Sequence, residues 1–494
     1  VDMRARRCGV VRSTDGGQTW DRPDASPSPA SFPFCFHTSG GVTQTPLAFG
    51  RDGTLYYGLV GWDTQDGGAR GNHSVLLARS TNLGESWATT IVRDARGKTD
   101  AEVENNRPVA SVAVDTKSGD KDIVYVAWRG NWPSAKPDRA SRPMVAVSTD
   151  GGRSFSEPLD AAADFYESPA VRGEAMKRVP PTPQPGPEAA TTASPAAESA
   201  EVPPPTTFGG GNPQVAVDDK GALYVLWVQA TPFSLTPRPE HPMYISRSTD
   251  RGRSFTVTEV SPASNWYGGP ILRWSNKGGP DGSLHVVYED KLGQTQGDRD
   301  IFYRRSVDGG KTWTDPRILH DDDPKLLIGQ FIPNFAVAPN GRLDVAWWDF
   351  RDDPGTYLND VYYTYSTDNG ETWSDNIRVT DRSINRRIGP WSNNFDMRQP
   401  PGIAPTDAFA LLAWDDTRDG EPVGQAQDIY AAAVQFREVG GGVSRTIQYL
   451  LAGVAGLLVV GLVLLGVALA GRRRSGPPPP ATEFPRDRQP VGVG

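Results

Sequence analysis

The chain has few of the residues on which many catalytic and metal centres depend. Its 494 residues include only two cysteines, five histidines and five methionines. Histidine is too scarce and too irregularly placed to suggest a histidine-based metal site or triad, so we expect neither a metal nor a cofactor. The formal net charge of −8 is spread along the chain. It argues against a nucleic-acid partner, because such a partner requires a basic face.

Helical periodicity is also scarce before residue 440. Glycine and proline are abundant, with 53 and 44 copies. Short apolar segments alternate with clusters of Gly, Asp, Asn and Pro, which is typical of an all-β chain.

One eight-residue motif, S-x-D-x-G-x-[ST]-[WF], recurs six times. Its copies span residues 13–20, 80–87, 148–155, 248–255, 306–313 and 366–373, and their third residues are Asp15, Asn82, Asp150, Asp250, Asp308 and Asp368. Asp binds nearby backbone amides and Gly accepts positive φ, so the motif predicts a tight turn that the final aromatic residue anchors. Six equivalent catalytic or metal sites would make little sense, so we interpret these residues as structural. Such repetition predicts a radial or solenoid array of one unit.

This octet resembles the Asp box, or BNR repeat, of the sialidase superfamily, and the resemblance extends over roughly residues 5–436. It implies a β-propeller. It implies little about activity, because Asp boxes also occur in other glycosidases, sorting receptors and assembly factors.

Between successive boxes the chain repeats a pattern of four strands, a to d, as expected for a propeller blade. The second strand, b, is the clearest, and its copies are Thr54–Trp62, Ile123–Trp128, Ala222–Trp227, Ser283–Tyr288, Arg342–Trp348 and Phe409–Trp414. We therefore predict an all-β propeller of four-stranded antiparallel blades. Five blades are complete, a sixth near residues 398–436 lacks a box, and the amino end supplies only strands c and d of a truncated blade. Six or seven blades fit, and seven is slightly favoured.

Cys8 and Cys35 flank the first Asp box. Two hairpin-linked strands would face each other there, so a disulfide is predicted. Two buried thiols are the alternative.

The predicted propeller covers residues 1–437, and the segments around it differ in composition. A Pro/Ala-rich insertion at 172–207 is predicted to be disordered. Residues 438–448 form a linker to an uncharged segment, 449–470, which is long enough to span a bilayer as a helix. Arginines 472–474 follow, so the Pro-rich tail 471–494 is expected in the cytoplasm and the propeller outside a cell membrane crossed once.

Export requires a signal peptide, and residues 1–7 do not resemble one. We therefore expect that the amino end is truncated and has lost a signal and at least two strands. A tail-anchored protein with a cytoplasmic propeller is the alternative, which the arginine cluster disfavours.

In the family that the octet resembles, the ligand binds over the central channel, on the face formed by the b–c and d–a loops. That resemblance implies three arginines that clamp a substrate carboxylate, a tyrosine nucleophile activated by a glutamate, and an aspartate general acid. The candidates for the clamp are Arg129, Arg351 and Arg418, with Arg107 and Arg398 in reserve. The candidate carboxylates are Asp63, Glu289, Asp349 and Asp415, and the possible nucleophiles are Tyr267 and Tyr288.

Three interpretations of these loop residues stay open. The recurrent Asp and Arg residues could brace the loops by pairing with each other, or clustered Asp oxygens could hold calcium. For the whole chain we expect a propeller that recognises a glycan or a cell-surface protein. An active exo-α-sialidase or other glycosidase is the first alternative, and a structural or assembly scaffold is the second.

Overall fold

The computed structural model of the chain describes part of its length. The described residues are 8–36, 47–62, 73–96, 110–131, 141–163, 165, 213–229, 242–262, 269–290, 299–323, 328–353, 358–388, 400–420 and 428–436. The predicted insertion at 172–207, the linker, the hydrophobic segment 449–470 and the tail lie outside them, as does Asp63. The chain divides into two compact units, Val1–Val434 and Gln435–Gly494. Within the described residues, no helix is long and apolar enough to cross a membrane.

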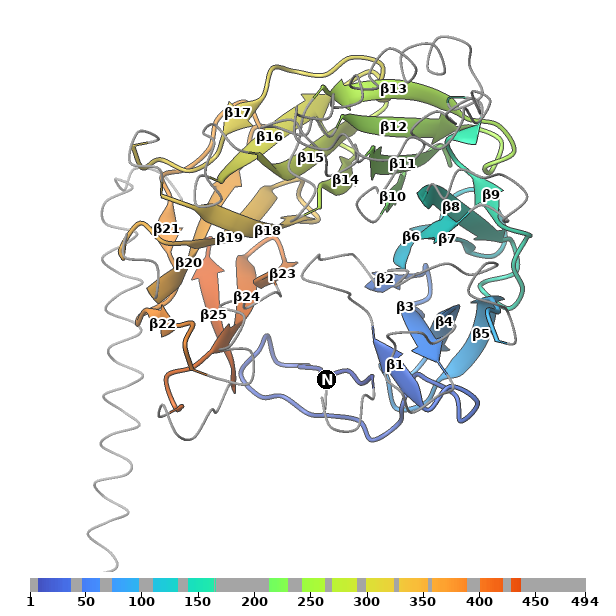
Figure 1. Ribbon diagram of the computed structural model, residues 1–494, viewed down its shortest axis with the longest axis horizontal. Coiled ribbons are helices and arrows are strands. Elements are labelled where there is room, and N and C mark those ends of the chain that lie inside the picture. Colours follow the sequence, from blue (N-terminus) through green and yellow to red (C-terminus); the bar gives the residue numbers. More distant parts are fainter. Residues whose placement is uncertain are drawn as a thin grey trace, which may run out of the picture. The chain divides into compact units, whose positions relative to one another are not determined.

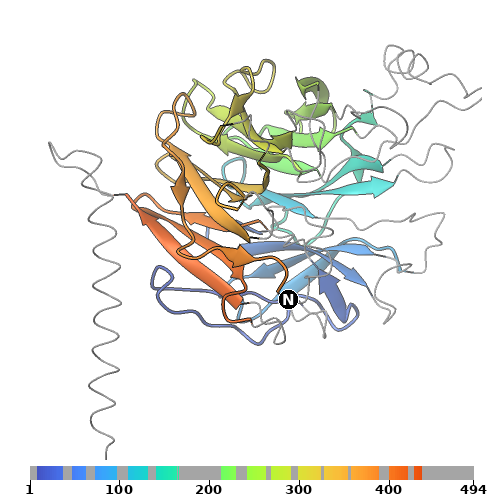
Figure 2. The same cartoon turned by 60° about the vertical axis from the view of Figure 1, so that its left-hand side comes forward.

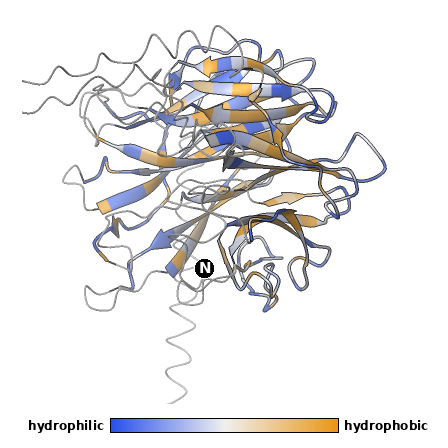
Figure 3. Ribbon diagram, turned by 45° about the vertical axis from the view of Figure 1, so that its right-hand side comes forward, coloured by the Kyte–Doolittle hydropathy of each residue, from blue (hydrophilic) through white to orange (hydrophobic). Residues whose placement is uncertain are grey.

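The described part of the first unit is built from short antiparallel strands. The second strands of three sheets, Leu55–Trp62, Leu223–Val228 and Leu343–Asp349, are buried along their whole length, and they are rich in Val, Leu, Tyr and Trp. Residues of this kind favour strands, and a continuous apolar run fits a strand that is covered on both faces. Figure 3 shows hydrophobic and hydrophilic residues alternating along the strands.

Each sheet, or blade, orders its strands from a to d, as the sequence predicts. The a strands are β1 (Phe34–Phe36) and β2 (Leu47–Phe49) in blade 1, then β6 (Ser111–Asp115), β10 (Gln214–Val217), β14 (Ile271–Ser275), β18 (Gln330–Val337) and β23 (Gly402–Pro405). The b strands are β3 (Leu55–Trp62), β7 (Ile123–Asn131), β11 (Leu223–Val228), β15 (Ser283–Asp290), β19 (Leu343–Asp349) and β24 (Phe409–Asp416). The prediction for strand b is thus confirmed in all six blades.

The outer strands complete the blades. The c strands are β4 (Ser74–Ser80), β8 (Ser141–Ser148), β12 (Met243–Ser248), β16 (Asp300–Ser306), β20 (Leu358–Ser366) and β25 (Asp428–Gln435). The d strands are β5 (Ala88–Arg93), β9 (Leu159–Asp160), β13 (Thr256–Ser261), β17 (Arg317–Ile318) and β21 (Ile377–Arg378), and β22 (Ile384–Asn385) adds a short pair to β20. Blade 6 has the three strands β23, β24 and β25 within the described residues.

The six sheets follow one another around a ring in chain order, as in a propeller (Figure 1). Their faces pack against each other through apolar clusters that join adjacent blades. Between blades 4 and 5, for example, Tyr303 and Val287 pack with Phe335 and Trp347. Burial of large aromatic side chains contributes strongly to such cores, so each blade depends on its neighbours for stability.

Blade 1 differs from the predicted pattern in its a strand. The sequence predicts one strand before residue 54, whereas the structure has two short ones beside β3. β1 pairs with the last residues of β3, from Val60 to Trp62, and β2 pairs with the first, from Leu55 to Tyr57. The chain between them, residues 37–46, lies outside the described residues.

The first Asp box occupies a position between blade 6 and blade 1. A Cβ on Gly17 would come within 3.0 Å of Leu411 in blade 6. On the other side, Arg12 donates to the Leu83 carbonyl and pairs with Glu85 in blade 1. Figure 2 shows this blue segment beside the red-orange strands of blade 6.

The contacts of Arg12 have a counterpart elsewhere in the ring. Arg305 of blade 4 donates to the Asn369 carbonyl and to Glu371, which hold the same positions in the box of blade 5. Residues 8–24 therefore stand where strands c and d of a seventh blade belong, and we call them the partial blade. Cys8 of this unit forms a disulfide with Cys35 of β1, with a Cα–Cα distance of 5.7 Å.

Candidate functional site

The blades have two unlike ends. At one end lie the a–b turns, which are three to seven residues long, and the Asp boxes that join strands c and d. At the other end lie the b–c connections, which are eight to fourteen residues long, and the d–a connections. We call this second end the loop end. Long loops on a rigid scaffold carry binding residues more often than tight turns do, and the predicted site residues all come from this end.

The Asp boxes at the opposite end are closed by their own hydrogen bonds. In every box the Ser hydroxyl donates to the third residue and accepts from the Gly amide, while the third residue accepts from the amide of the seventh. Hydrogen bonds from Ser254 and Ser248 hold the pKa of Asp250 at about 2. The box carboxylates are thus fully used inside the turn, as the structural interpretation predicts.

At the loop end of blade 5, a Trp–Asp–Arg group closes the end of β19. The indole nitrogen of Trp347 donates to Asp349 Oδ2 over 2.8 Å. Asp349 Oδ1 accepts from the Arg351 amide over 2.8 Å, and Arg351 Nη2 donates back to Oδ2 over 2.8 Å. Asp349 is buried, so this carboxylate is neutralised within its own turn.

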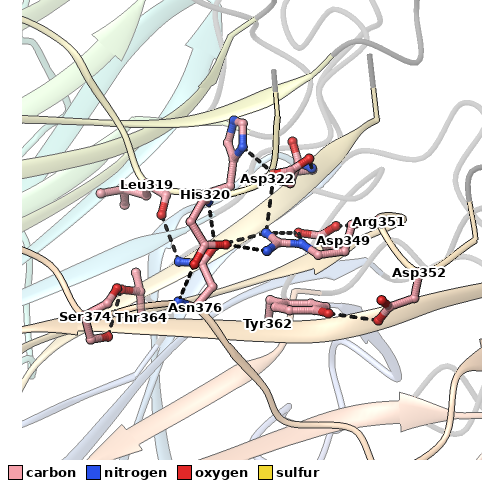
Figure 4. A network of polar contacts seen from close by, with 12 residues as sticks. Leu319, His320, Asp322, Asp349, Arg351, Asp352, Tyr362, Thr364, Ser374 and Asn376 are labelled. Atoms are coloured by element: carbon pink, nitrogen blue, oxygen red, sulfur yellow. Dashed lines mark hydrogen bonds and ion pairs between the residues drawn. The ribbon is translucent and has the colours of Figure 1, made fainter. Parts of the chain in front are cut away.

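Arg351 also reaches into the preceding blade. It donates to Asp321, which follows strand d of blade 4, and to Asn376 over 3.0 Å. Its guanidinium lies 4.1 Å from the ring centroid of Tyr362. Burial alone would lower the pKa of Arg351, but the bonds to Asp349 and Asp321 outweigh it and raise that pKa. Figure 4 shows this network, which we call the blade 5 latch.

Blade 6 repeats the latch. The indole nitrogen of Trp414 donates to Asp416 over 3.1 Å, and Arg418 pairs with both Asp416 and Asp381, each over 2.7 Å. The guanidinium lies 4.1 Å from the ring centroid of Tyr430. Asp381 follows strand d of blade 5, so this latch also joins two blades. We call it the blade 6 latch.

The predicted carboxylate Asp415 is not a member of the blade 6 latch. Asp416, the next residue, takes the place that Asp349 has in blade 5. Successive residues of a strand point to opposite faces, so Asp415 faces away from Arg418. Burial raises the pKa of Asp415. The sequence analysis chose Asp415, and the recurrent Trp-x-Asp-x-Arg spacing is the signal that would have indicated Asp416 instead.

A buried histidine extends the blade 5 latch toward blade 4. His320 Nδ1 lies 2.6 Å from Asp322, and Nε2 lies 2.8 Å from Asp300. Burial lowers the pKa of His320, but the two carboxylates outweigh it and raise that pKa to about 9. His320 is therefore protonated at neutral pH. Together, His320 and Arg351 pair with carboxylates from three segments, namely Asp300, Asp321 with Asp322, and Asp349.

Tyr288 and Glu289 are adjacent in β15 and point to opposite faces of the sheet. Tyr288 is 2% exposed and packs in the cluster between blades 3 and 4. Glu289 is fully buried, accepts from the Ile332 amide in blade 5 and lies 3.7 Å from Arg299. A tyrosine nucleophile and its activating glutamate must share one site, so Tyr288 and Glu289 do not act as such a pair with each other.

Ile332 itself has an unusual backbone. Its φ is +50°, which is a rare conformation for a β-branched residue, and it lies at an irregularity in the register of β18. Glu289 holds this inner strand by accepting its amide. Glu289 thus has a structural partner that sequence reasoning did not predict.

The third predicted clamp residue, Arg129, lies near the end of β7 in blade 2, three blades from Arg351 along the ring. Burial lowers its pKa. The structure therefore does not gather Arg129, Arg351 and Arg418 in one blade interface.

Sequence reasoning missed the partners that the d–a segments and strand c supply. These are His320, Asp321, Asp322, Asn376 and Asp381 from the d side, and Tyr362 and Tyr430 from strand c. A usable signal was present, because Tyr362 and Tyr430 each follow an Asp plus an apolar residue in strand c, Asp360-Val361 and Asp428-Ile429. Among the described residues, no group of three or more His, Cys, Asp or Glu side chains could hold a metal ion.

Comparison with known proteins gives limited matches. The family model described as BNR/Asp-box repeat matches residues 364–375, which include the whole sixth box. A search of curated protein sequences gives no match.

Solved structures with a similar course include a protein of unknown function from Dyadobacter fermentans (14% identity, 81% of this chain and 97% of that chain, TM-score 0.43). A second is the Trypanosoma rangeli sialidase in complex with the inhibitor DANA, with 12% identity over 81% of this chain and 55% of that chain and a TM-score of 0.42. A third is the Penicillium chrysogenum alpha-L-arabinanase complexed with arabinobiose, with 16% identity over 70% of this chain and 82% of that chain and a TM-score of 0.39. These identities and scores are too low to bear on the chemistry of the loop end. The family match identifies the sixth octet as a BNR/Asp-box repeat.

Proposed function

We propose that this chain is a sialidase-like propeller that recognises a glycan or a protein ligand at its loop end without cleaving it. The observation that carries this proposal is the use of Arg351 and Arg418 as latches between blades. A carboxylate clamp needs guanidinium groups whose donors are free for the substrate. Here each guanidinium is already neutralised by two aspartates and covered by a tyrosine ring.

The asymmetry of the two ends supports recognition at the loop end. The box end consists of tight turns whose polar groups are bonded to each other, whereas the b–c connections are long. The d–a connections belong to the same end, and aromatic residues in their sequence, such as Trp266 between β13 and β14, suit stacking on apolar sugar faces. We also propose that the propeller is displayed outside the cell, because segment 449–470 and the arginines after it predict an anchor in that orientation.

The test uses the full chain in detergent solution with a fluorogenic sialoside, a fluorogenic arabinofuranoside and a glycan array. We expect saturable binding of at least one glycan or protein and no turnover above the buffer rate. Turnover that disappears in Arg351→Ala while the protein stays folded would establish the exo-sialidase alternative instead.

A second pair of variants tests the location. Trp266→Ala should weaken ligand binding by about tenfold, which is the loss expected for one stacked aromatic ring. Leu83→Ala alters an exposed side chain in an Asp box and should leave binding unchanged. Equal effects of both variants would place the ligand elsewhere.

A further inference from the structure

One position on the innermost strands of the blades breaks their repeat. In blades 1 to 5 it lies opposite the strand b residue that pairs, on its other side, with the residue before the box serine. The shared Trp-x-Asp-x-Arg pattern aligns blade 6 with blade 5. Five blades have alanine at this position, namely Ala48, Ala113, Ala216, Ala336 and Ala404. Blade 4 has Arg273 there, so the residue serves a purpose that the fold of a blade does not require.

The arginine cannot occupy the place that the alanines take. Ala113 packs in the cluster between blades 2 and 3, and Ala216 packs in the one between blades 3 and 4. A long charged side chain does not fit into such an apolar interface. The guanidinium of Arg273 instead turns back to its own strand, where Nη1 donates to the carbonyl of Leu272 over 2.8 Å. The side chain is partly exposed.

The carbonyl of Leu272 points to the inner edge of the sheet. In blade 3 the equivalent residue is Val215, whose N–H donates to Ser111 on the inner strand of the neighbouring blade over 3.2 Å. The N–H and C=O of one residue in an antiparallel pair point to the same side. Both groups of Leu272 therefore point away from β15, and the guanidinium of Arg273 lies beside them on the inner edge of β14. Figure 1 shows β14 on the inner side of its blade.

No carboxylate in the described part of the chain forms an ion pair with Arg273, whose hydrogen bond goes to a neutral carbonyl. The residue opposite it on strand b is His285, and burial and the charge of Arg305 lower the pKa of His285 to about 3. This histidine is therefore neutral and supplies no countercharge. Desolvation lowers the pKa of Arg273 to about 10. A desolvated charge without a partner destabilises a fold, so an anion bound from solution would explain why it is kept.

We propose that the inner edge of β14 binds one small oxyanion, a carboxylate or phosphate group, between the guanidinium of Arg273 and the N–H of Leu272. Arginine presents planar donors that match two oxygens of such a group, and backbone N–H groups bind the same oxygens. One anion binds per chain, because only blade 4 has arginine at this position. The proposal holds whether or not the loop end recognises a glycan.

The test uses the full chain in detergent solution, with inorganic phosphate and acetate as the two probes at constant ionic strength. Isothermal titration calorimetry measures affinity and stoichiometry. We expect one site per chain and a melting temperature that rises with the concentration of the bound anion, because a ligand of the native state stabilises it. Binding of phosphate alone would assign the site to phosphate groups, and binding of acetate alone would assign it to carboxylates.

Three variants locate the site. Arg273→Ala introduces the residue that five blades already have, so it should fold, and it should lower the affinity at least tenfold. Arg273→Gln keeps much of the length without the charge and should have the same effect. Arg253→Ala removes an exposed arginine from the fourth Asp box and should leave the affinity unchanged. Circular dichroism spectra show whether each variant is folded.

Three results would overturn the proposal. The first is the absence of saturable binding of either anion by the folded wild-type protein. The second is binding that both variants of Arg273 leave intact. The third is an equal loss of affinity in Arg253→Ala, because the anion would then respond to the net charge of the protein rather than to the inner edge of β14.

Discussion

Arg351 and Asp321 belong to neighbouring blades and are joined by a hydrogen bond of 2.5 Å. Arg418 and Asp381 make the same connection one blade further on. A ring of sheets is stable only if each sheet stays packed on the next, and these bonds fasten the blades where their long loops begin. The recurrence of the latch in two blades favours the interpretation in which Asp and Arg brace the loops.

Arg351→Ala should destabilise the protein. The arginine side chain is 13% exposed and its partner Asp349 is fully buried, so removal of the guanidinium leaves an uncompensated buried carboxylate. Breaking a buried pair in this way costs about 3–5 kcal/mol. Urea denaturation followed by tryptophan fluorescence measures this free energy.

Arg96→Ala is the matched control. It removes an arginine that pairs with Asp94 in an exposed pair, with side chains 35% and 43% exposed, and such pairs contribute about 1 kcal/mol or less. Similar losses in both variants would contradict the role of the blade 5 latch.

The loss of stability on replacing Asp368, the aspartate of the sixth box, should depend on which hydrogen-bonding atoms the new residue keeps. Asp368→Ala removes the acceptor of the Ser366 hydroxyl and of the Thr372 amide, so we expect a loss of about 2 kcal/mol. Asp368→Asn should cost much less. The second box already has Asn82, whose Oδ1 accepts the equivalent bonds from Ser80 and Ser86.

Thermal denaturation of the two variants measures the difference. The order of their melting temperatures should be wild type, then Asn, then Ala. An Asn variant as unstable as the Ala variant would mean that the charge, rather than the acceptor geometry, holds the turn.

The pH dependence of stability should show the protonated His320. Its pKa is raised to about 9, from an ordinary value of 6.5. A raised histidine pKa stabilises the folded protein fully below pH 6.5, and this contribution is lost as the pH rises toward 9. The loss should amount to about 2–3 kcal/mol, since each pKa unit corresponds to about 1.4 kcal/mol and the groups are coupled.

Urea denaturation at pH 6, 7.5 and 9 tests this expectation. The wild-type free energy of unfolding should fall across the series, and most of the fall should be absent in His320→Gln. A wild-type protein whose stability does not change between pH 6.5 and 9 would show that His320 is neutral.

The architecture was largely readable from the sequence, because local patterns encode it. The octet specifies its own turn through hydrogen bonds between its side chains and nearby amides. The apolar composition of the b strands, such as Ile123–Trp128, predicts that they are buried. Both signals arise within a few residues, so no knowledge of the neighbouring blades is required.

The candidate site was less predictable, because its contacts join segments far apart in the chain. The sequence predicts Arg351 as a site residue, but its partner Asp321 comes from the preceding blade. It also predicts Asp415 as a site carboxylate, whereas Asp416 is the residue that pairs with Arg418. Similarly, the candidates Tyr288 and Glu289 are adjacent in sequence, whereas the alternation of the strand turns their side chains to opposite faces. Pairing across a blade interface depends on which face each residue takes, and spacing alone does not give it.

The Cys8–Cys35 disulfide should control how firmly the partial blade is held. It closes a separation of 27 residues and joins the partial blade to β1, and a loop of this size contributes about 3 kcal/mol in the chain-entropy model. Its other described contacts include the bonds of Arg12 to blade 1, the packing of Val10 against the cluster that contains Tyr57, and the packing of Gly17 on Leu411. Reduction, or the double variant Cys8→Ser with Cys35→Ser, should therefore expose Arg12 to trypsin while the apolar interfaces of blades 2 to 5 keep those blades folded.

Limited proteolysis followed by mass spectrometry would detect early cleavage near residue 12. Cleavage at equal rates in the oxidised and reduced proteins would show that the non-covalent contacts alone hold the partial blade in place.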